Sequence, residues 1–273
     1  MGDKNSCGFD TLFNKHLPHI VEKIFLSLDY ESLKTCYEVS NKWKEFIISD
    51  SFQKRAKDTF SSDIEDDEMY LCEAANTGDT DENRSILSYG LIDVNYVGWI
   101  YARTALHEAS QSGHNVIAKI LLDHDADPNI VDEDNWQTPL HIAAASNHKE
   151  VSKTLLDNGA EPNKADRSGE TPLHGAAYQG FGDIVKILLE GGADPNVGGE
   201  DYVGSPLFFA VLNDERSVVK TLLDAGADPN LGNEQEYSPL GKARQSHYTE
   251  LAQILEDAGA EIWSDTDEYF EYK

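Results

Sequence analysis

The amino-acid sequence predicts an all-α protein, in which a short three-helix segment precedes a solenoid of paired helices joined by β-hairpin loops. The first observation is a four-residue pattern that recurs every 33 or 34 residues, at 104–107, 138–141, 171–174, 205–208 and 238–241. The second is the pattern Ala-x-Pro-Asn, which follows at a fixed distance, at 126–129, 160–163, 193–196 and 227–230. A constant period in the range of 20–50 residues is typical of stacked repeat proteins.

The N-terminal segment, residues 11–55, lies outside the repeats and is expected to form three short helices. In the first helix, apolar residues occupy the i, i+3, i+4 and i+7 positions, namely Val21, Ile24, Phe25 and Leu28. Asp29 can cap the second helix, and the third carries Trp43 on its apolar side. Such a small core is expected to pack on a partner or on the adjacent domain.

The repeats are expected to span residues 69–265, between an acidic connector at 56–68 and an acidic tail at 266–273. Six units are predicted, at approximately 69–98, 101–131, 135–165, 168–198, 202–232 and 235–265. The first and last units keep the pattern least well. End units of a repeat stack deviate because they must cover its apolar faces.

Within one unit, the residue types fit two short helices and a turn. Thr138 can cap the first helix, and Pro139 suits the first helical position, where its missing N–H costs nothing. Val151 and Leu155 give the second helix an apolar stripe, and Gly159 supplies a left-handed residue that ends it. The polar residues that follow are expected to form a projecting hairpin.

The two patterns and their common phase resemble the ankyrin repeat. This resemblance implies an interaction module that binds a client protein through its hairpin tips and the exposed side of each first helix. On the first helices, the predicted client-binding residues are Gln111, Ser112, Ser146, Asn147, Tyr178, Gln179, Leu212 and Asn213. On the hairpins, they are the aromatic residues Trp99, Tyr101, Trp136, Tyr202 and Tyr237, whose alternative role is to staple one hairpin to the next.

The N-terminal segment resembles an F-box, because it has a Leu-Pro start, an ordered apolar series and a Val-Ser-x-x-x-Trp ending. The family usually has an acidic residue after the proline, where this chain has His19. The resemblance implies docking onto the Skp-type adaptor of a cullin ubiquitin ligase, through Leu17, Pro18, Val21, Ile24, Phe25, Leu28, Leu33, Cys36, Val39 and Trp43. The alternative is a three-helix cap packed on the first repeat.

The two resemblances together predict a substrate-recognition adaptor, which holds a client near the catalytic subunits of a ubiquitin ligase. The alternative from another class is an ankyrin-repeat scaffold or inhibitor with no link to ubiquitin. An enzyme is the least favoured class, because no nucleophile lies in a strand–turn–helix context and no glycine-rich loop could cradle a phosphate.

The charge distribution points to the kind of client. The net charge is −28, yet residues 1–60 hold nine basic and nine acidic residues, so residues 61–273 carry the whole excess. Such a surface repels nucleic acid and anionic lipid and attracts a basic partner. The acidic hairpin residues Asp132, Glu133 and Asp134 are expected to form a rim beside an aromatic anchor. The alternative is that the acidity serves solubility alone.

No metal or cofactor is expected. The repeated histidines His107, His141 and His174 occur once per repeat, and packed helices stand about 8–10 Å apart, too far for shared zinc ligation. The three cysteines show no paired spacing, and the chain lacks a secretion signal and a membrane-length apolar run. These features favour the cytoplasm, with the nucleus as an alternative.

The consensus asparagines are candidates for modification. Each has a leucine eight residues earlier, and in this setting they resemble targets of the oxygen-dependent asparaginyl hydroxylase: Asn95, Asn129, Asn163, Asn196 and Asn230. The alternative is purely structural, because asparagine side chains commonly form hydrogen bonds within turns.

Overall fold

The computed structural model describes residues 25–26, 28–32, 52, 56, 59–88, 92–98, 102–198, 204–232 and 238–261. Over these residues all regular secondary structure is α-helical, which confirms the predicted all-α class. None of the helices described there is long and apolar enough to cross a membrane.

The described helices follow one another in pairs. The first members of the pairs form an inner row: α6 (Ser61–Thr77), α8 (Ala105–Ser112), α10 (Pro139–Ala145), α12 (Pro172–Tyr178), α14 (Pro206–Leu212) and α16 (Pro239–Gln245). The second members form an outer row: α7 (Thr80–Ser88), α9 (Asn115–Asp123), α11 (Lys149–Asp157), α13 (Gly182–Glu190), α15 (Arg216–Asp224) and α17 (Thr249–Asp257).

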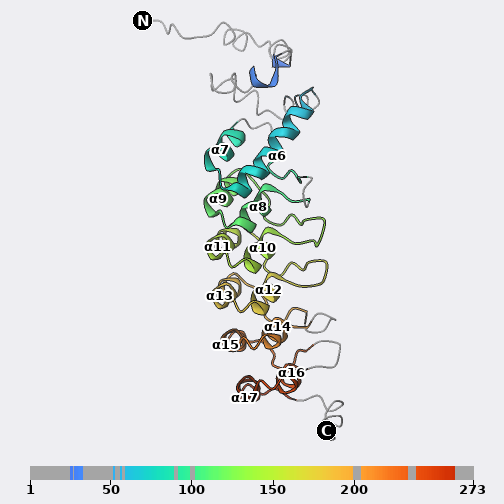
Figure 1. The fold of residues 1–273 in the computed structure, drawn as a ribbon, viewed down its shortest axis with the longest axis vertical. Coiled ribbons are helices and arrows are strands. Elements are labelled where there is room, and N and C mark those ends of the chain that lie inside the picture. Colours follow the sequence, from blue (N-terminus) through green and yellow to red (C-terminus); the bar gives the residue numbers. More distant parts are fainter. Residues whose placement is uncertain are drawn as a thin grey trace, which may run out of the picture.

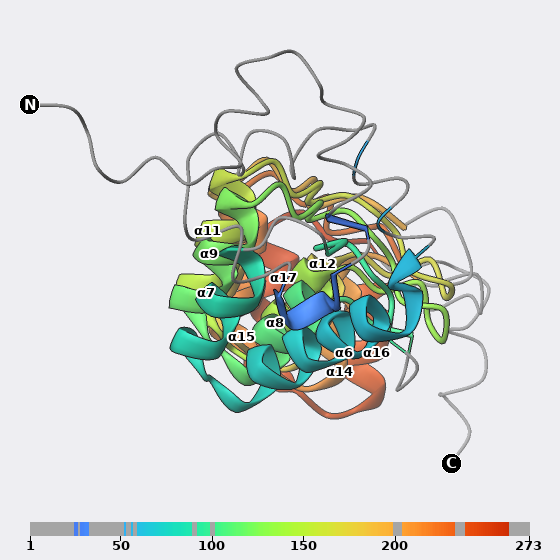
Figure 2. The ribbon, with the colours of Figure 1, turned by 90° about the horizontal axis from the view of Figure 1, so that it is seen from above.

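The two rows run side by side along the long axis of the molecule, and the loops project on the side of the inner row (Figure 1). The view along the stack shows the outer helices α7, α9 and α11 lying over one another (Figure 2). Each inner helix from α8 to α16 buries one leucine between its neighbours: Leu106, Leu140, Leu173, Leu207 and Leu240. The repeats thus share one continuous core, as expected when single repeats cannot bury their apolar faces alone.

The starts of the inner helices follow from their capping residues. Thr138 precedes α10 in extended conformation, its hydroxyl accepts a hydrogen bond from the N–H of His141, and Pro139 is the first helical residue. Ser205 and Ser238 do the same for α14 and α16. The predicted capping role is confirmed, and it explains why the four-residue pattern marks each repeat.

The turns between paired helices use a left-handed residue. At Gly113 the backbone φ is +75°, and a Cβ would lie 2.5 Å from Nδ1 of His148, so only glycine fits. The matching residues Asn147, Asp214 and His247 hold the same conformation with a side chain. Glycine is therefore required at Gly113, where a side chain of the next repeat packs against the turn.

The start of the first repeat differs from the sequence-based expectation. The stretch 61–68, predicted as part of an acidic connector, forms the first two turns of α6. The physical reason is burial on one side of the helix: Ile64 is buried, and the buried Glu68 carboxylate accepts a hydrogen bond from the N–H of Asp93 at 2.6 Å. Glu65 and Asp66 between them are exposed, so the stretch is amphipathic rather than uniformly polar.

The projecting loops are tighter than the predicted β-hairpins. In one loop the N–H of Asp132 donates to the carbonyl of Gln137 at 2.9 Å, and in the next the N–H of Asp166 donates to the carbonyl of Glu170 at 2.8 Å. Within the described residues no strand extends beyond these closing bonds. The loops are fixed instead by the carboxylates of Asp132 and Asp166, which accept hydrogen bonds from backbone N–H groups of their own loops.

Candidate functional site

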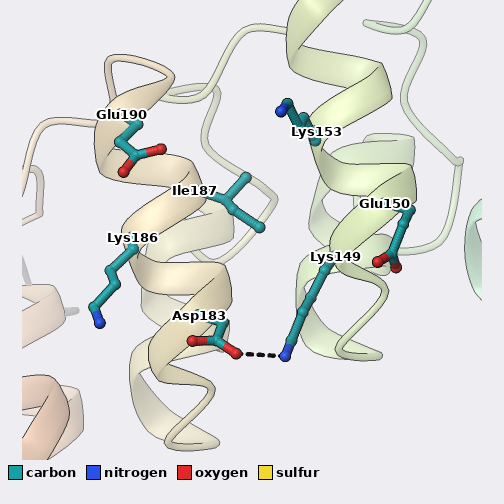
Figure 3. A pocket seen from close by; sticks show the side chains of 7 residues that line it. All are labelled: Lys149, Glu150, Lys153, Asp183, Lys186, Ile187 and Glu190. Atoms are coloured by element: carbon teal, nitrogen blue, oxygen red, sulfur yellow. Dashed lines mark hydrogen bonds and ion pairs between the residues drawn. The ribbon is translucent and has the colours of Figure 1, made fainter.

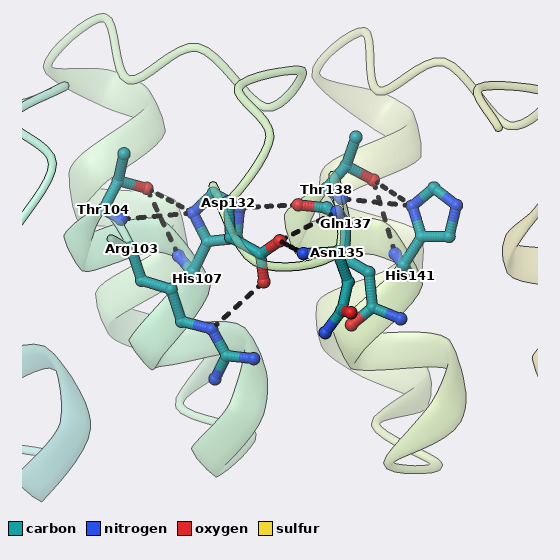
Figure 4. A network of polar contacts seen from close by, with 8 residues as sticks. All are labelled: Arg103, Thr104, His107, Asp132, Asn135, Gln137, Thr138 and His141. Carbon is teal, nitrogen blue, oxygen red and sulfur yellow. Dashed lines mark hydrogen bonds and ion pairs between the residues drawn. The ribbon is translucent and has the colours of Figure 1, made fainter. Parts of the chain in front are cut away.

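The loop between α9 and α10 is organised by Asp132, which is fully buried (Figure 4). Its carboxylate accepts hydrogen bonds from the N–H groups of Asn135 and Gln137, both at 3.0 Å, and pairs with the Arg103 guanidinium at 3.4 Å. Asp132 therefore cannot belong to an exposed acidic rim, which corrects the prediction for this residue. Glu133 and Asp134 are exposed, as a rim requires.

Trp136 follows these residues at the tip of the same loop, and its side chain is 51% exposed. Its φ is +59°, a left-handed conformation that glycine adopts freely and bulky residues rarely adopt. The residue at the same place in the next repeat, two positions before the capping threonine, is Gly169, with φ +84°. A tryptophan thus occupies a left-handed backbone position at which the next repeat uses glycine and the preceding repeat uses Ala102, with φ +47°.

Arg167, from the next loop, lies against this tryptophan. Its guanidinium carbon is 5.2 Å from the centroid of the Trp136 ring, a cation–π arrangement. The same residue donates its backbone N–H to the carbonyl of Asn135 at 2.8 Å and its guanidinium to the carbonyl of Glu133 at 3.2 Å. The ring is therefore partly stapled to the next loop, as the alternative role predicts, while the residue as a whole stays 51% exposed.

The repeated histidines tie each repeat to the next. Nε2 of His107 donates to the carbonyl of Gln137 at 3.0 Å, and Nδ1 accepts the N–H of Thr104 at 3.2 Å. His141 and His174 make the same bonds. Because a carbonyl only accepts, Nε2 carries the proton and the ring is neutral. Burial lowers the pKa of His107 and of His174 to about 4, and it also lowers that of His141.

The predicted client-binding residues of the inner row lie on or near its surface, but several are engaged by neighbouring repeats. Gln111 donates its side-chain amide to the hydroxyl of Ser146 at 3.1 Å, and the Ser112 hydroxyl donates to Asn76 at 2.9 Å. Asn213 donates its side-chain amide to the carbonyl of Tyr178. Asn147 and Gln179 are exposed, and Leu212 is half-buried.

Among the inner helices α8 to α16, Tyr178 is the most exposed large aromatic residue, at 41%. Its ring meets the ring of Phe209 on α14 edge-on, at 6.2 Å between centroids. Sequence reasoning missed Phe209, because it singled out first-helix residues by two positions near the helix end, and it missed the loop residue Arg167. A signal was available in Phe209, a large apolar residue that is only partly buried on the inner helix.

Four of the predicted hairpin aromatics lie outside the described residues: Trp99, Tyr101, Tyr202 and Tyr237. The same holds for most of the predicted adaptor-binding residues, namely Leu17, Pro18, Val21, Ile24, Leu33, Cys36, Val39 and Trp43. Their roles stay predictions from the sequence.

The described adaptor-binding candidates are Phe25 and Leu28. Leu28 is half-buried, whereas Phe25 is only 1% exposed and meets Phe52 edge-on at 6.1 Å. Phe25 therefore packs within the chain, which corrects its assignment as an adaptor contact. Nearby, the Tyr30 hydroxyl donates to Asp67 of α6 at 3.0 Å. A contact of this kind with α6 is what a cap on the first repeat would make.

The consensus asparagines form a ladder between repeats. The side-chain oxygen of Asn129 accepts the N–H of Glu161 at 2.8 Å, and its amide donates to the carbonyl of Gly159 at 3.0 Å. The side chains of Asn95, Asn163 and Asn196 bond to the following repeat in the same two ways. The structural role thus links repeats rather than closing one turn, and hydroxylation stays a prediction.

The described residues offer little for catalysis. They contain no group of three His, Cys, Asp or Glu side chains that could hold a metal ion. Burial raises the pKa of the Cys72 thiol to about 12, which keeps it protonated and unreactive at neutral pH. A shallow depression of about 380 Å³ between α11 and α13 is lined mainly by charged residues, and the Lys149 ammonium pairs with Asp183 across it (Figure 3). Its three lysines and three acidic residues balance, so the depression has no net charge.

The comparisons with known proteins agree with this fold. A family model described as ankyrin repeats (3 copies) matches residues 130–199, and the single ankyrin repeat model matches 102–133 and 205–234. An ankyrin repeat domain from Acinetobacter baumannii is 28% identical, with a TM-score of 0.63, over 71% of this chain and 100% of that one. The ankyrin repeat domain of human ASB11 is 30% identical, with a TM-score of 0.62, over 70% of this chain and 84% of that one. No curated protein matches the chain significantly.

Proposed function

The chain belongs to the ankyrin-repeat family, and we propose that it is a non-catalytic substrate receptor. Its repeats hold a client protein, and its N-terminal segment docks the Skp-type adaptor of a cullin ubiquitin ligase. The chain contributes proximity: by tethering the client, it raises the client's effective concentration at a catalytic centre on other subunits. The alternative remains a scaffold or inhibitor that binds the client without any ubiquitin ligase.

Trp136 is the observation that carries the client-binding part. A left-handed backbone destabilises a residue with a Cβ by about 1–2 kcal/mol relative to glycine. A half-exposed tryptophan buries only part of its apolar surface, so it stabilises the fold less than a buried one would. Strained residues concentrate at functional sites, because the surrounding structure holds them for a purpose other than stability. Tryptophan is also among the residues enriched at the energetic centre of protein interfaces.

The surroundings of Trp136 suit a basic segment of a client. Glu133 and Asp134 are exposed beside the ring, and they add negative potential around an apolar and cation-attracting surface. An exposed rim of this kind mainly steers association, while the ring supplies contact area that slows dissociation. The client we propose therefore presents a Lys- or Arg-bearing segment.

The adaptor-docking part rests on the order of residues in the N-terminal segment. The contact of Tyr30 with Asp67 supports a fixed relation between this segment and α6, because a tilted ring contact between Tyr30 and Phe60 accompanies it at 5.8 Å. A fixed relation would hold the client at a set place relative to the adaptor. The same contact suits a cap with no adaptor, so docking needs its own test.

Client binding is tested by Trp136→Gly, expressed as the full tagged chain and compared with wild type by quantitative affinity purification. Because glycine suits the left-handed backbone, we expect the free energy of unfolding measured by urea titration to stay within about 1 kcal/mol of wild type. Capture of the main client should fall at least about tenfold. Val116→Ala removes an exposed apolar side chain from the outer row and is the matched control. Equal capture by wild type and Trp136→Gly would remove the role of this residue.

Adaptor docking is tested by replacing Leu17 and Pro18 with alanine in the same full chain. Co-purification with a recombinant Skp-type adaptor should be lost, while client capture and the helical circular-dichroism signal stay unchanged. If the wild-type chain does not bind the adaptor, the scaffold alternative replaces the receptor proposal and leaves client binding standing.

A further inference from the structure

The solvent-facing positions of the inner row change in character along the stack. Counted from the capping residue as position one, position five of helices α8 to α16 is occupied in order by Glu108, Ile142, Gly175, Phe209 and Lys242, of which Ile142 is buried and the other four are partly exposed. Position eight is occupied by Gln111, Ala145, Tyr178, Leu212 and Gln245. The centre of this face is apolar, whereas its ends are polar or charged.

The apolar centre contains a fixed aromatic group. The Phe209 ring lies edge-on between two rings of α12, 5.1 Å from that of His174 and 6.2 Å from that of Tyr178. Because His174 is held by hydrogen bonds to Thr171 and Gly204, the ring it supports is also held in place. The exposed ring of Tyr178 thus stands on a rigid base, as an anchor site for another chain requires.

Next to these rings, the inner row presents small residues. Gly175 is partly exposed in the middle of α12, and the nearest atom to a Cβ built there is Cβ of Ala145, at 3.8 Å. Ala145 is exposed and presents only a methyl group. Small residues on two successive helices, with Tyr178 and Phe209 beside them, form a floor that an apolar side chain can fill.

Opposite charges lie beyond the apolar centre on its two sides. On the N-terminal side are the half-buried Glu108 of α8 and the exposed Glu73 of α6, and on the C-terminal side is Lys242 of α16. Neighbouring helices stand about 10 Å apart, so Glu108 and Lys242 are each about 20 Å from Gly175. An extended chain covers that distance in about six residues. The opposite charges at its two ends can therefore orient a bound segment that carries complementary charges.

We propose that the inner row binds one extended segment of the client, with an apolar residue seated over Gly175 between Tyr178 and Phe209. A basic residue about six positions to one side would face Glu108, and an acidic residue at a similar distance on the other side would face Lys242. This inference rests on the proposed function that the repeats hold a client, and it names the chemistry of the segment they hold.

The test selects a displayed library of random 16-residue peptides on the full chain and measures the affinity of the enriched peptides by fluorescence anisotropy. The key variant is Gly175→Leu, which covers the small-residue surface with a bulky side chain; Gly175 has no left-handed backbone, and leucine is a better helix former. The matched control is Gly182→Leu at the start of α13 in the outer row, where a Cβ meets nothing within 4 Å.

We expect peptides with an apolar centre between a basic and an acidic end, a loss of affinity of at least tenfold in Gly175→Leu, and no change in Gly182→Leu. Lys242→Glu should weaken these peptides several-fold, and replacing their acidic end with lysine should restore the affinity. Enriched peptides that Gly175→Leu binds as well as wild type, or a wild-type chain that enriches none, would overturn the inference. Sensitivity to Trp136→Gly without sensitivity to Gly175→Leu would do so too, while leaving the proposed function intact.

Discussion

Two parts of the solenoid solve the same packing problem with different residues. Residues 104–198, here the histidine repeats, begin each inner helix with a threonine and place a histidine three positions later. Residues 205–261, here the serine repeats, begin with serine and have Phe208 and Gly241 at the histidine position. In the histidine repeats a neutral imidazole reaches the loop of the next repeat.

The serine repeats make the corresponding tie without a titratable group. The Ser205 hydroxyl donates to the carbonyl of Leu231 in the following loop at 2.8 Å, and Phe208 is buried where the histidine would stand. Replacing the histidine of the four-residue pattern with Phe208 therefore does not remove the hydrogen bond to the following repeat. The Ser205 hydroxyl makes that bond, and it does not depend on the protonation state of a side chain.

The largest expected difference between the two parts is their response to acid. Burial lowers the pKa of His107 and His174 to about 4, below the 6.5 of an exposed histidine. Between these values the unfolded chain binds more protons than the folded one, so the free energy of unfolding falls as the pH falls from about 6.5 to 4. The loss is on the order of 3 kcal/mol for each of the two histidines.

Hydrogen exchange at pH 7 and pH 4.5, corrected for intrinsic rates, distinguishes the parts. Amides of α8 to α13 should lose protection in acid by more than those of α14 to α17. Equal losses in both parts, or an earlier opening of the serine repeats, would show that the histidines do not control the acid response.

A smaller effect is expected from deleting single ties. His174→Ala leaves the carbonyl of Gly204 and the cap at Thr171 without their partner and opens a cavity, which should cost about 3 kcal/mol of unfolding free energy. Ser205→Ala removes a hydroxyl that both caps α14 and donates to Leu231, and should cost about 1–2 kcal/mol. Urea titration at pH 7 measures both, and a larger cost for Ser205→Ala would reverse the ranking of the two ties.

Within one loop of the histidine repeats, buried and exposed acidic residues should contribute differently to the free energy of unfolding. Asp132→Ala removes the acceptor of two backbone N–H groups and of Arg103, so we expect a loss of about 2–3 kcal/mol. The double change Glu133→Gln and Asp134→Asn alters exposed residues only and should stay within about 0.5 kcal/mol. Thermal and urea unfolding of the two variants would contradict this view of the loop if their costs were similar.

The smallest expected effect is on association. Neutralising Glu133 and Asp134 should slow client association a few-fold at low salt and leave dissociation unchanged, because exposed charges act through a field that salt screens within about 8 Å at physiological strength. Trp136→Gly should mainly speed dissociation. Surface-binding kinetics at two salt concentrations separate these effects, and a salt-independent association rate would mean that the acidity serves solubility.

The sequence predicted the parts of the fold that depend on local chemistry. The capping residue and proline before each inner helix, such as Thr138 and Pro139, specify a helix start wherever they occur, and their period reveals the stack. It failed for Asp132, because an aspartate that accepts its own loop's N–H groups has the same sequence context as an exposed one. It also failed for the start of α6, where the burial of Ile64 and Glu68 depends on their packing in the folded chain.

The candidate site was less predictable, because it depends on contacts between repeats. Trp136 stood out as an aromatic loop residue, but its left-handed backbone is seen only in the folded loop, and its contact with Arg167 comes from the neighbouring loop. The small-residue surface at Gly175 depends on the small size of Ala145 one repeat earlier and on the rings beside it. A reading of one repeat at a time does not bring such residues together.

The most direct test of the central claim, that the loop tips and the inner row hold the client, is hydrogen exchange of the full chain with and without the client captured by affinity purification. Binding should protect the loop around Trp136 and the inner helices α10, α12 and α14, and should leave the outer helices α11 and α13 unchanged. Protection confined to the outer row would contradict the claim.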